Sequence, residues 1–440
     1  MKKDALSARS EPVLYARDNF SVMTPGYPDL SGQQATAAYV LALERTASSW
    51  MPVPLTPPAT TGSFSSVGSS AAASFARLLW RVAAADVSQG NHPTLLRNGA
   101  AVFDAMLAAI AKARHSVDME CYIFQGDDEV GAKFVLALEE AAGRGVRVRL
   151  LVDWIGGRGT PRRVWRALRE HGVELRIFSR LGPHAWLGLL PRDHRKLLVT
   201  DGKLGITGGV GIGQEWRLGS VGPKRTPWRD SAVQIKGPAA VAMERAFDAM
   251  WLRAVGAGPT RRESHRMVRA ARNSWIDFAD ASPALVGIVE GEPGRFRVSR
   301  ALEIQAAAAR EKLWIATAYF IPAFGVMESL KGAARDGVDV RVLVPGRNDH
   351  PWVNRFTRSY YPSLLRNGVR VWEWQGEMMH AKSSVMDGVI TRIGSTDFNP
   401  LGAAINYELD AIIGDREFGA AAEAMFLADL EQSTEVKRKK

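Results

Sequence analysis

The chain has 440 residues, of which 46% are hydrophobic and 23% charged, and 57 Lys and Arg against 46 Asp and Glu leave a formal net charge of +11. This composition is typical of a globular protein and excludes disorder, collagen and coiled coil as the main theme. At about 150 residues per domain the length predicts two or three units. The positive charge favours an anionic partner, such as nucleic acid, acidic lipid or a phosphorylated substrate.

Residues 1–90 are predicted to form an N-terminal extension. A helix is expected over 33–47, and the uncharged stretch 46–76 is so rich in Pro, Ser and Gly that it indicates a linker and not a membrane span. The Ala-rich segment 71–85 has helical spacing; we expect it to pack on the body, with a membrane-surface helix as the alternative. No window of about 18 consecutive apolar residues predicts a transmembrane helix, and no secretory signal is visible.

From about residue 91 the predicted elements repeat. Helices over 100–114 and 130–142 alternate with strands that end at 124 and 153, and 301–345 shows the same order. Tyr122 and Tyr319 are 197 residues apart, and other landmarks keep nearly that offset. We therefore predict an α/β protein of two duplicated α/β/α sandwich domains, 91–258 and 259–440, each with a mostly parallel sheet. An Arg-rich stretch within 261–272 lies at the join.

Two copies of the pattern H-x-K-x4-D occur at equivalent places in the repeat, and each precedes a turn of small residues. They are His194, Lys196 and Asp201, before Gly208 and Gly209, and His380, Lys382 and Asp387, before Gly394 and Ser395. In a strand, residues two apart point to the same face, so each His and its Lys project together. A pseudo-twofold axis would bring both pairs to one shared site.

This arrangement suits a tetrahedral phosphate. Lysines neutralise its non-bridging oxygens and one imidazole attacks phosphorus, giving a phosphohistidine intermediate. The other imidazole protonates the leaving oxygen and later deprotonates the incoming one. No metal or other cofactor is expected, because the lysines supply the positive charge. The single cysteine, Cys121, also excludes a disulfide framework and a Cys-based zinc site.

These paired motifs, together with the run 406–408, resemble the phospholipase D superfamily. Segments 194–209, 227–239, 318–322, 349–361 and 380–388 are similar to bacterial cardiolipin synthases that lack N-terminal membrane spans. The likeness covers about 95–430. It implies that His194 is the nucleophile and His380 the acid/base, although the sequence leaves the reverse assignment open. It also implies phosphate binding by Lys196 and Lys382.

Further roles follow from the resemblance alone. Asp201 and Asp387 belong to the signature, and a structural or orienting role is expected for them. Asp230 and Glu408 are expected to accept a proton from a catalytic imidazole and hold its tautomer.

Two positions depart from the family pattern. The family usually has Asn two residues after the small-residue turn, where this chain has Gly211 and Asp397, with an Asn displaced to Asn399. Loss of a neutral donor weakens phosphate binding, and a carboxylate there repels phosphate unless it is hydrogen-bonded or protonated.

Two apolar features bear on the substrate. The loop 184–190 precedes the first motif. It could receive acyl chains or dip into a bilayer, or it could fold back on the body, and the sequence favours neither. Four aromatic residues at helical spacing, Trp352, Phe356, Tyr360 and Tyr361, are assigned to a core face, with an acyl channel as the alternative. The basic tail 437–440 favours an anionic leaflet.

We predict a phosphatidyltransferase that moves a phosphatidyl group between glycerophospholipids such as phosphatidylglycerol, peripheral at the cytoplasmic side of the cell membrane. Hydrolysis, by a phospholipase D or a nuclease, and a non-catalytic protein that binds anionic lipid or nucleic acid are the alternatives. Nucleic acid is disfavoured because the basic residues are scattered and not interleaved with aromatics. The sequence does not set the oligomeric state. Because the duplication provides an internal pseudo-dimer, a single chain could form the complete site.

Overall fold

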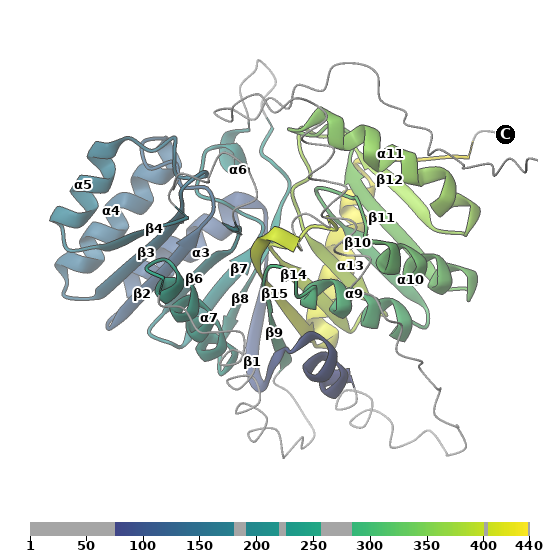
Figure 1. The fold of residues 1–440 in the computed structure, drawn as a ribbon, viewed down its shortest axis with the longest axis horizontal. Coiled ribbons are helices and arrows are strands. Elements are labelled where there is room, and N and C mark those ends of the chain that lie inside the picture. Colours follow the sequence, from purple (N-terminus) through teal and green to yellow (C-terminus); the bar gives the residue numbers. More distant parts are fainter. Residues whose placement is uncertain (1–74, 180–190, 220–225, 257–283, 400–403, 439–440) are drawn as a thin grey trace, which may run out of the picture.

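The computed structural model describes residues 75–179, 191–219, 226–256, 284–399 and 404–438. The predicted helix over 33–47, the linker, the loop 184–190, the Arg-rich stretch within 261–272 and the last two residues of the tail lie outside these ranges. Within them the chain forms two similar α/β halves, which lie side by side along the longest axis of the molecule (Figure 1).

The first half is built on three parallel strands, extended by antiparallel ones. Its strands are β1 (Asp86–Arg97), β2 (Ser116–Cys121), β3 (Arg147–Asp153), β4 (Glu174–Phe178), β5 (Arg192–Asp193), β6 (Lys196–Thr200), β7 (Leu204–Gly208) and β8 (Ser231–Lys236). Its helices are α3 (Asn98–Lys112), α4 (Glu129–Gly143), α5 (Arg162–Glu170), α6 (Glu215–Leu218) and α7 (Ala239–Arg253). The Asp128 carboxylate caps α4 by accepting from the Gly131 backbone N–H, as expected of Asp at that position.

The second half repeats this plan. Its strands are β9 (Ala284–Gly291), β10 (Lys312–Ala316), β11 (Asp339–Pro345), β12 (Arg370–Trp374), β13 (Ser383–Met386), β14 (Ile390–Gly394), β15 (Asn406–Gly414) and β16 (Ser433–Glu435). Its helices are α9 (Arg297–Ala308), α10 (Phe324–Arg335), α11 (Pro351–Arg366) and α13 (Arg416–Leu430). Asp415 caps α13 as Asp128 caps α4.

The strands form one continuous path, β16-β12-β11-β10-β13-β14-β15-β9-β1-β8-β7-β6-β2-β3-β4. Read outward from the centre, β1-β8-β7-β6-β2-β3-β4 corresponds to β9-β15-β14-β13-β10-β11-β12. The halves meet where β1 and β9 pair antiparallel. This order confirms the predicted duplication of an α/β unit about a pseudo-twofold axis.

The expectation of mostly parallel sheets is wrong. Only β2-β3-β4 and β10-β11-β12 run parallel in this path. The strands that carry the motifs, β6 and β13, turn back through tight hairpins whose turn residues, Asp201-Gly202 and Asp387-Gly388, all have positive φ. Asp-Gly favours such turns, and a hairpin joins antiparallel strands without a crossover helix.

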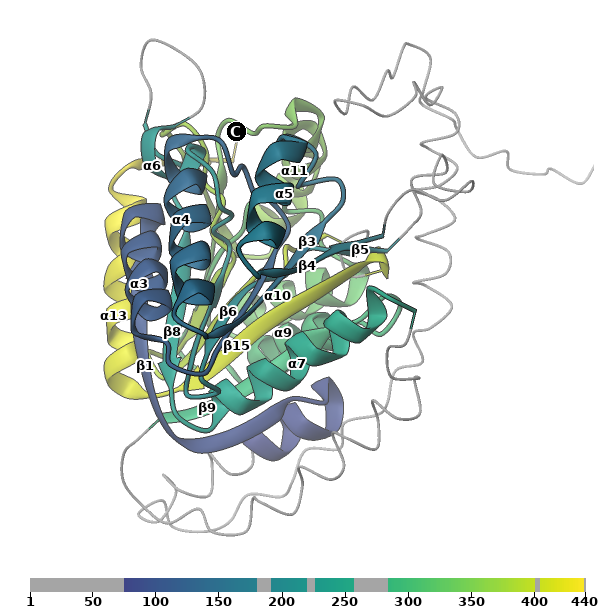
Figure 2. The same ribbon diagram turned by 90° about the vertical axis from the view of Figure 1, so that its left-hand side faces the viewer.

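Helices cover both faces of the sheet: α7, α9 and α10 lie on one side, and α3 and α13 on the other (Figures 1 and 2). The described part of the Ala-rich segment packs on the body, because Phe75, Ala76, Leu79 and Ala83 are buried in the core of the second half. β1 begins at Asp86, so the predicted boundary at residue 90 falls inside a strand. No helix of the described residues is long and apolar enough to span a bilayer.

Candidate active site

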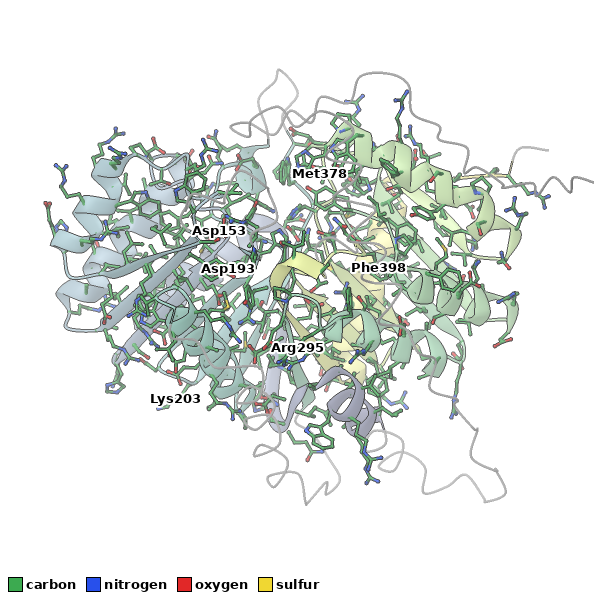
Figure 3. All side chains as sticks on the ribbon, viewed as in Figure 1. Asp153, Asp193, Lys203, Arg295, Met378 and Phe398 are labelled. Carbon is green, nitrogen blue, oxygen red and sulfur yellow. The ribbon has the colours of Figure 1, made fainter. Side chains whose placement is uncertain are left out.

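The two motifs occupy equivalent places at the centre of the molecule. Lys196 begins β6 and pairs with Cys121, the last residue of β2, and Ser383 begins β13 and pairs with Ala316, the last residue of β10. Both histidines therefore lie at the carboxyl ends of the parallel strands. In Figure 3 Asp193, which directly precedes His194, lies near the middle of the molecule, and Met378, two residues before His380, lies above it toward the upper edge.

Each histidine is held by a carboxylate from the other half. His194 Nδ1 lies 3.0 Å from both carboxylate oxygens of Glu408, and His380 Nδ1 lies 2.8 Å from Asp230 Oδ2. Asp230 precedes β8 and Glu408 lies in β15, the equivalent strand. Because each carboxylate bonds Nδ1, Nε2 is the ring nitrogen available for reaction. The resemblance implied that each carboxylate supports a catalytic imidazole, and the structure places each one beside the histidine of the opposite half.

Short backbone contacts fix these crossed pairs. The His194 N–H donates to the Tyr407 carbonyl at 3.0 Å, where β5 pairs parallel with the start of β15. The His380 N–H donates to the Arg229 carbonyl at 2.7 Å, and Arg229 forms an isolated parallel bridge with Met379. Each histidine is therefore tied through its own backbone to the residue that precedes its carboxylate partner.

Each lysine side chain lies against the backbone of its own histidine. Lys196 Nζ donates to the His194 carbonyl at 2.6 Å, and Lys382 Nζ donates to the His380 carbonyl at 2.8 Å. Both side chains are buried. Two ammonium groups in low dielectric attract an anionic centre far more strongly than they would in water.

Burial shifts the pKa values of the first histidine and its neighbours. Burial, followed by the charges of Lys196 and Lys382, holds the pKa of His194 well below its usual range, so the imidazole is neutral at pH 7. Burial raises the pKa of Glu408 to about 7 and lowers that of Lys196 to about 8. A neutral imidazole is the form that can attack phosphorus.

The motif aspartates lie at the far end of their strands. Asp201 accepts hydrogen bonds from the backbone N–H groups of residues 114–116, and Asp387 does so from those of residues 310–312. Asp201 follows Lys196 by five positions, which is about 16 Å along an extended strand. Both aspartates therefore hold the segments that enter β2 and β10, and neither lies beside an imidazole.

The two departures from the family pattern have local explanations. A Cβ at position 211 would lie 2.9 Å from Trp216 Cη2, so the indole fills the space of the missing side chain. The same indole donates to Asp230 Oδ2 at 2.8 Å. Asp397 accepts from the hydroxyl of Thr317 and the N–H groups of Ala318 and Tyr319, and its other oxygen lies 3.2 Å from Lys382 Nζ. The carboxylate is thus hydrogen-bonded, which is the condition under which we expected it not to repel phosphate.

The remaining predicted residues support these groups. Ser395 Oγ donates to Glu408 Oε2, whereas the equivalent Gly209 leaves no room for a side chain, since a Cβ there would lie 2.2 Å from Asp230 Oδ1. The Asn399 N–H donates to the Asp397 carbonyl at 2.8 Å. Glu408 is therefore oriented by a serine hydroxyl and Asp230 by an indole.

Sequence reasoning missed the aromatic neighbours of the site. The Tyr122 ring packs edge-on against His194 at 4.9 Å, and Tyr319 lies edge-on to His380 at 6.3 Å. Each tyrosine ring also lies within 6 Å of the lysine ammonium of its own motif. The shared offset of the two tyrosines was visible in the sequence, but their contacts with the motifs were not. Trp216 carried no such signal.

The assignment of four aromatic residues to a core face is only partly correct. Tyr361 is buried, whereas Trp352 and Phe356 are 38% and 39% exposed. Cys121 is buried, and burial raises the pKa of its thiol. The described residues contain no group of three or more His, Cys, Asp or Glu side chains arranged to hold a metal ion.

Comparison with known proteins agrees with this geometry. The family model described as "Cardiolipin synthase, PLD-like domain" matches residues 106–251 and 302–430. The chain is 32% identical to cardiolipin synthase A of Pseudomonas putida over 348 residues, which are 79% of this chain and 69% of that protein. It is 31% identical to cardiolipin synthase 1 of Bacillus cereus over 347 residues, 78% of this chain and 67% of that protein.

Two solved structures share the fold. One is a phosphatidylserine synthase of Haemophilus influenzae, with a TM-score of 0.61, 14% identity, and coverage of 83% of this chain and 92% of that chain. The other is a polyphosphate kinase of Porphyromonas gingivalis, with a TM-score of 0.52, 12% identity, and coverage of 78% and 48%.

Proposed function

Because the chain belongs to the phospholipase D-like cardiolipin synthase family, we propose that it is a phosphatidyltransferase that moves a phosphatidyl group from one glycerophospholipid to a hydroxyl group of another. With phosphatidylglycerol as donor and acceptor, the products are cardiolipin and glycerol. The observation that carries the proposal is the pair of histidines, each held at Nδ1 by a carboxylate of the opposite half.

In the first step, His194 Nε2 attacks phosphorus while the bond from phosphorus to the headgroup oxygen breaks. His380, oriented by Asp230, gives its Nε2 proton to that oxygen, and the alcohol leaves. Lys196 and Lys382 stabilise the charge on the non-bridging oxygens. The phosphatidyl group is then bound to nitrogen.

In the second step, the hydroxyl of the acceptor lipid gives its proton to His380. The resulting oxygen nucleophile attacks phosphorus, and the bond from phosphorus to His194 breaks. Water in place of the lipid hydroxyl would give phosphatidic acid, so the same site supports hydrolysis, and exclusion of water decides the balance between the two reactions. The substrate lies in a bilayer and the net charge is +11; we therefore place the enzyme peripherally at the cytoplasmic face of the membrane.

The test is to incubate the purified protein with phosphatidylglycerol vesicles in the presence of a chelator and to separate the lipids. Cardiolipin is the expected product. Phosphatidic acid alone would assign a hydrolase, and lack of turnover of both lipid and DNA would assign a binding protein. His194→Ala and His380→Ala should each abolish lipid turnover. His171→Ala is the matched control, because that side chain is 58% exposed and lies at the end of α5.

A second experiment separates the roles of the two histidines. We use a phosphodiester whose p-nitrophenol leaving group needs no proton at neutral pH. His380→Ala should then release about one equivalent of nitrophenolate in a burst and retain phosphorus on the protein, whereas His194→Ala should release none. A burst from His194→Ala with none from His380→Ala would reverse the assignment.

A further inference from the structure

Helices α5 and α11 are equivalent in the two halves and lie on the same side of the molecule. α5 connects β3 to β4, and α11 connects β11 to β12. Both helices lie at the upper side in two perpendicular views, toward opposite ends of the long axis (Figures 1 and 2). Each follows the carboxyl end of a central parallel strand, which is the edge of the sheet where the histidine motifs lie.

Both helices carry an excess of exposed positive charge. α5 has four arginines and one glutamate, and α11 has three arginines and no acidic residue. Among the described residues, Arg163 is the only arginine of α5 with a carboxylate within 4.0 Å, that of Asp127 at 3.9 Å. On α11 Arg358 alone has such a partner within the described part of the chain, Glu373 at 2.8 Å. The remaining arginines of both helices are available to an anionic surface.

Exposed aromatic side chains on α11 connect this charge to the site. Trp352 and Phe356 are 38% and 39% exposed and meet edge-on at 5.9 Å. Trp352 lies 6.4 Å from the His350 ring, His350 lies 6.0 Å from Tyr319, and Tyr319 lies 6.3 Å from His380. A continuous series of rings therefore runs from the surface to the second motif.

We propose that the exposed faces of α5 and α11 form one docking surface for an anionic lipid bilayer. We name it the docking face and define it by Arg162, Arg163 and Arg166 of α5 and Trp352, Arg355 and Phe356 of α11. The inference rests on the proposed function, because the substrate of that function must be drawn from a membrane.

The side-chain chemistry favours a bilayer over nucleic acid. Tryptophan is enriched at the membrane–water interface because one end of the ring system is apolar and the other polar. Each arginine near an anionic leaflet adds roughly 1 kcal/mol of attraction. A lipid whose headgroup enters the site can rest its apolar part on the rings between Trp352 and Tyr319, and so need not leave the bilayer completely.

The experiment measures co-sedimentation of the full chain with vesicles of phosphatidylcholine, with and without phosphatidylglycerol. Arg162→Gln/Arg163→Gln/Arg166→Gln should weaken partitioning into the anionic vesicles about a hundredfold. Trp352→Ala/Phe356→Ala should weaken binding to both vesicle types. Thermal melting of each variant, expected within a few degrees of the unsubstituted protein, verifies that it is folded.

Lys112→Gln/Arg114→Gln/Arg310→Gln is the matched control, because it removes the same charge at the opposite edge of the sheet, where β2 and β10 begin. Charges there lie beyond the screening length of about 8 Å from a bilayer on the docking face, so binding should change less than threefold. The inference is overturned if this control loses as much binding as the α5 variant, or if neither docking-face variant loses any.

Two further measurements distinguish a failure of the docking face from a failure of the proposed function. If the unsubstituted protein binds duplex DNA but not anionic vesicles, and the α5 variant no longer binds DNA, the docking face binds nucleic acid and the inference is wrong. Turnover of monomeric short-chain phosphatidylglycerol by the unsubstituted protein tests the proposed function without a bilayer. Lack of that turnover counts against the function, while the vesicle measurements still decide the docking face.

Discussion

At the scale of single residues, the two histidines are related by the pseudo-twofold axis but have different surroundings. His194 is flanked by Asp193 and Arg195, which are both fully buried. Arg195 donates to the Ala246 carbonyl of α7 and pairs with Glu290 at 3.1 Å. His380 is flanked by the buried apolar residues Met379 and Ala381. The duplicated motif therefore occupies two electrostatic environments, which suits a division between nucleophile and acid/base.

The first prediction concerns the pH dependence of turnover. With the pKa of Glu408 raised to about 7 and that of Lys196 lowered to about 8, both by burial, kcat/KM should follow a narrow bell. Below the lower value Glu408 is protonated and can no longer accept the Nδ1 proton of His194. Above the upper value Lys196 loses the charge that binds phosphate. Initial rates on vesicles across pH 5 to 10 measure both limbs.

Two conservative variants identify the limbs. Glu408→Gln should remove the acidic limb and Lys196→Arg should move the alkaline limb upward; a bell unchanged in both would contradict the assignment.

The stability of the fold should respond to pH in the opposite direction to the acidic limb of the activity profile. Because folding raises the pKa of Glu408 from 4.5 to about 7, the native state binds this proton more tightly than the unfolded state. The free energy of unfolding should therefore fall as pH rises through this interval, and Glu408→Gln should remove that fall.

At the scale of elements, one buried ion pair ties the first half to a helix of the second. Arg229 Nε and Nη2 each lie 2.7 Å from a carboxylate oxygen of Asp429 on α13, and both side chains are almost fully buried. Arg97, at the end of β1, adds a third contact at 2.9 Å. Since Arg229 is followed by Asp230 and bonds the His380 N–H through its carbonyl, this pair also fixes the support of the second histidine.

The second prediction concerns this pair. Asp429→Asn leaves the Arg229 guanidinium buried without a counter-charge and should lower the free energy of unfolding by about 3–5 kcal/mol. Arg229→Met/Asp429→Leu removes both charges and should recover part of that loss. Glu129→Gln, in an exposed pair on α4, is the control, with an expected change below about 0.5 kcal/mol. Urea titration gives all values, and a double variant less stable than Asp429→Asn would contradict the argument.

At the scale of the whole molecule, the site exists only where the two halves meet. β1 and β9 join them into one sheet, and each half supplies one histidine together with the carboxylate that orients the histidine of the other half. A single chain thus contains what a symmetric dimer would otherwise assemble. Neither half has a complete catalytic pair of its own.

The third prediction tests this intramolecular arrangement. A mixture of the His194→Ala and His380→Ala proteins should remain inactive on phosphatidylglycerol at every ratio, because each chain retains one histidine and the halves of different chains do not combine. Recovery of about a quarter of the normal rate after mixing, or after unfolding and refolding together, would show exchange of halves between chains. The unsubstituted protein treated in the same way is the control.

The sequence by itself determined the duplication and the two His-Lys pairs. These features depend on spacing along the chain, and a repeat carries them to equivalent places whatever the packing. The spacing also agrees with the structural role that the resemblance implied for Asp201 and Asp387, because four residues separate each one from its lysine.

Only the tertiary structure decided the rest. The indole of Trp216 fills the space beside Gly211, and Asp397 gains its donors from 317–319, because packing brings together segments that are distant in the sequence. The antiparallel strands around β6 and β13 follow from two short hairpins within a pattern that otherwise predicts crossovers. The alignment of α5 with α11 depends on how the halves join at β1 and β9, a relation that no local pattern of charge or hydrophobicity specifies.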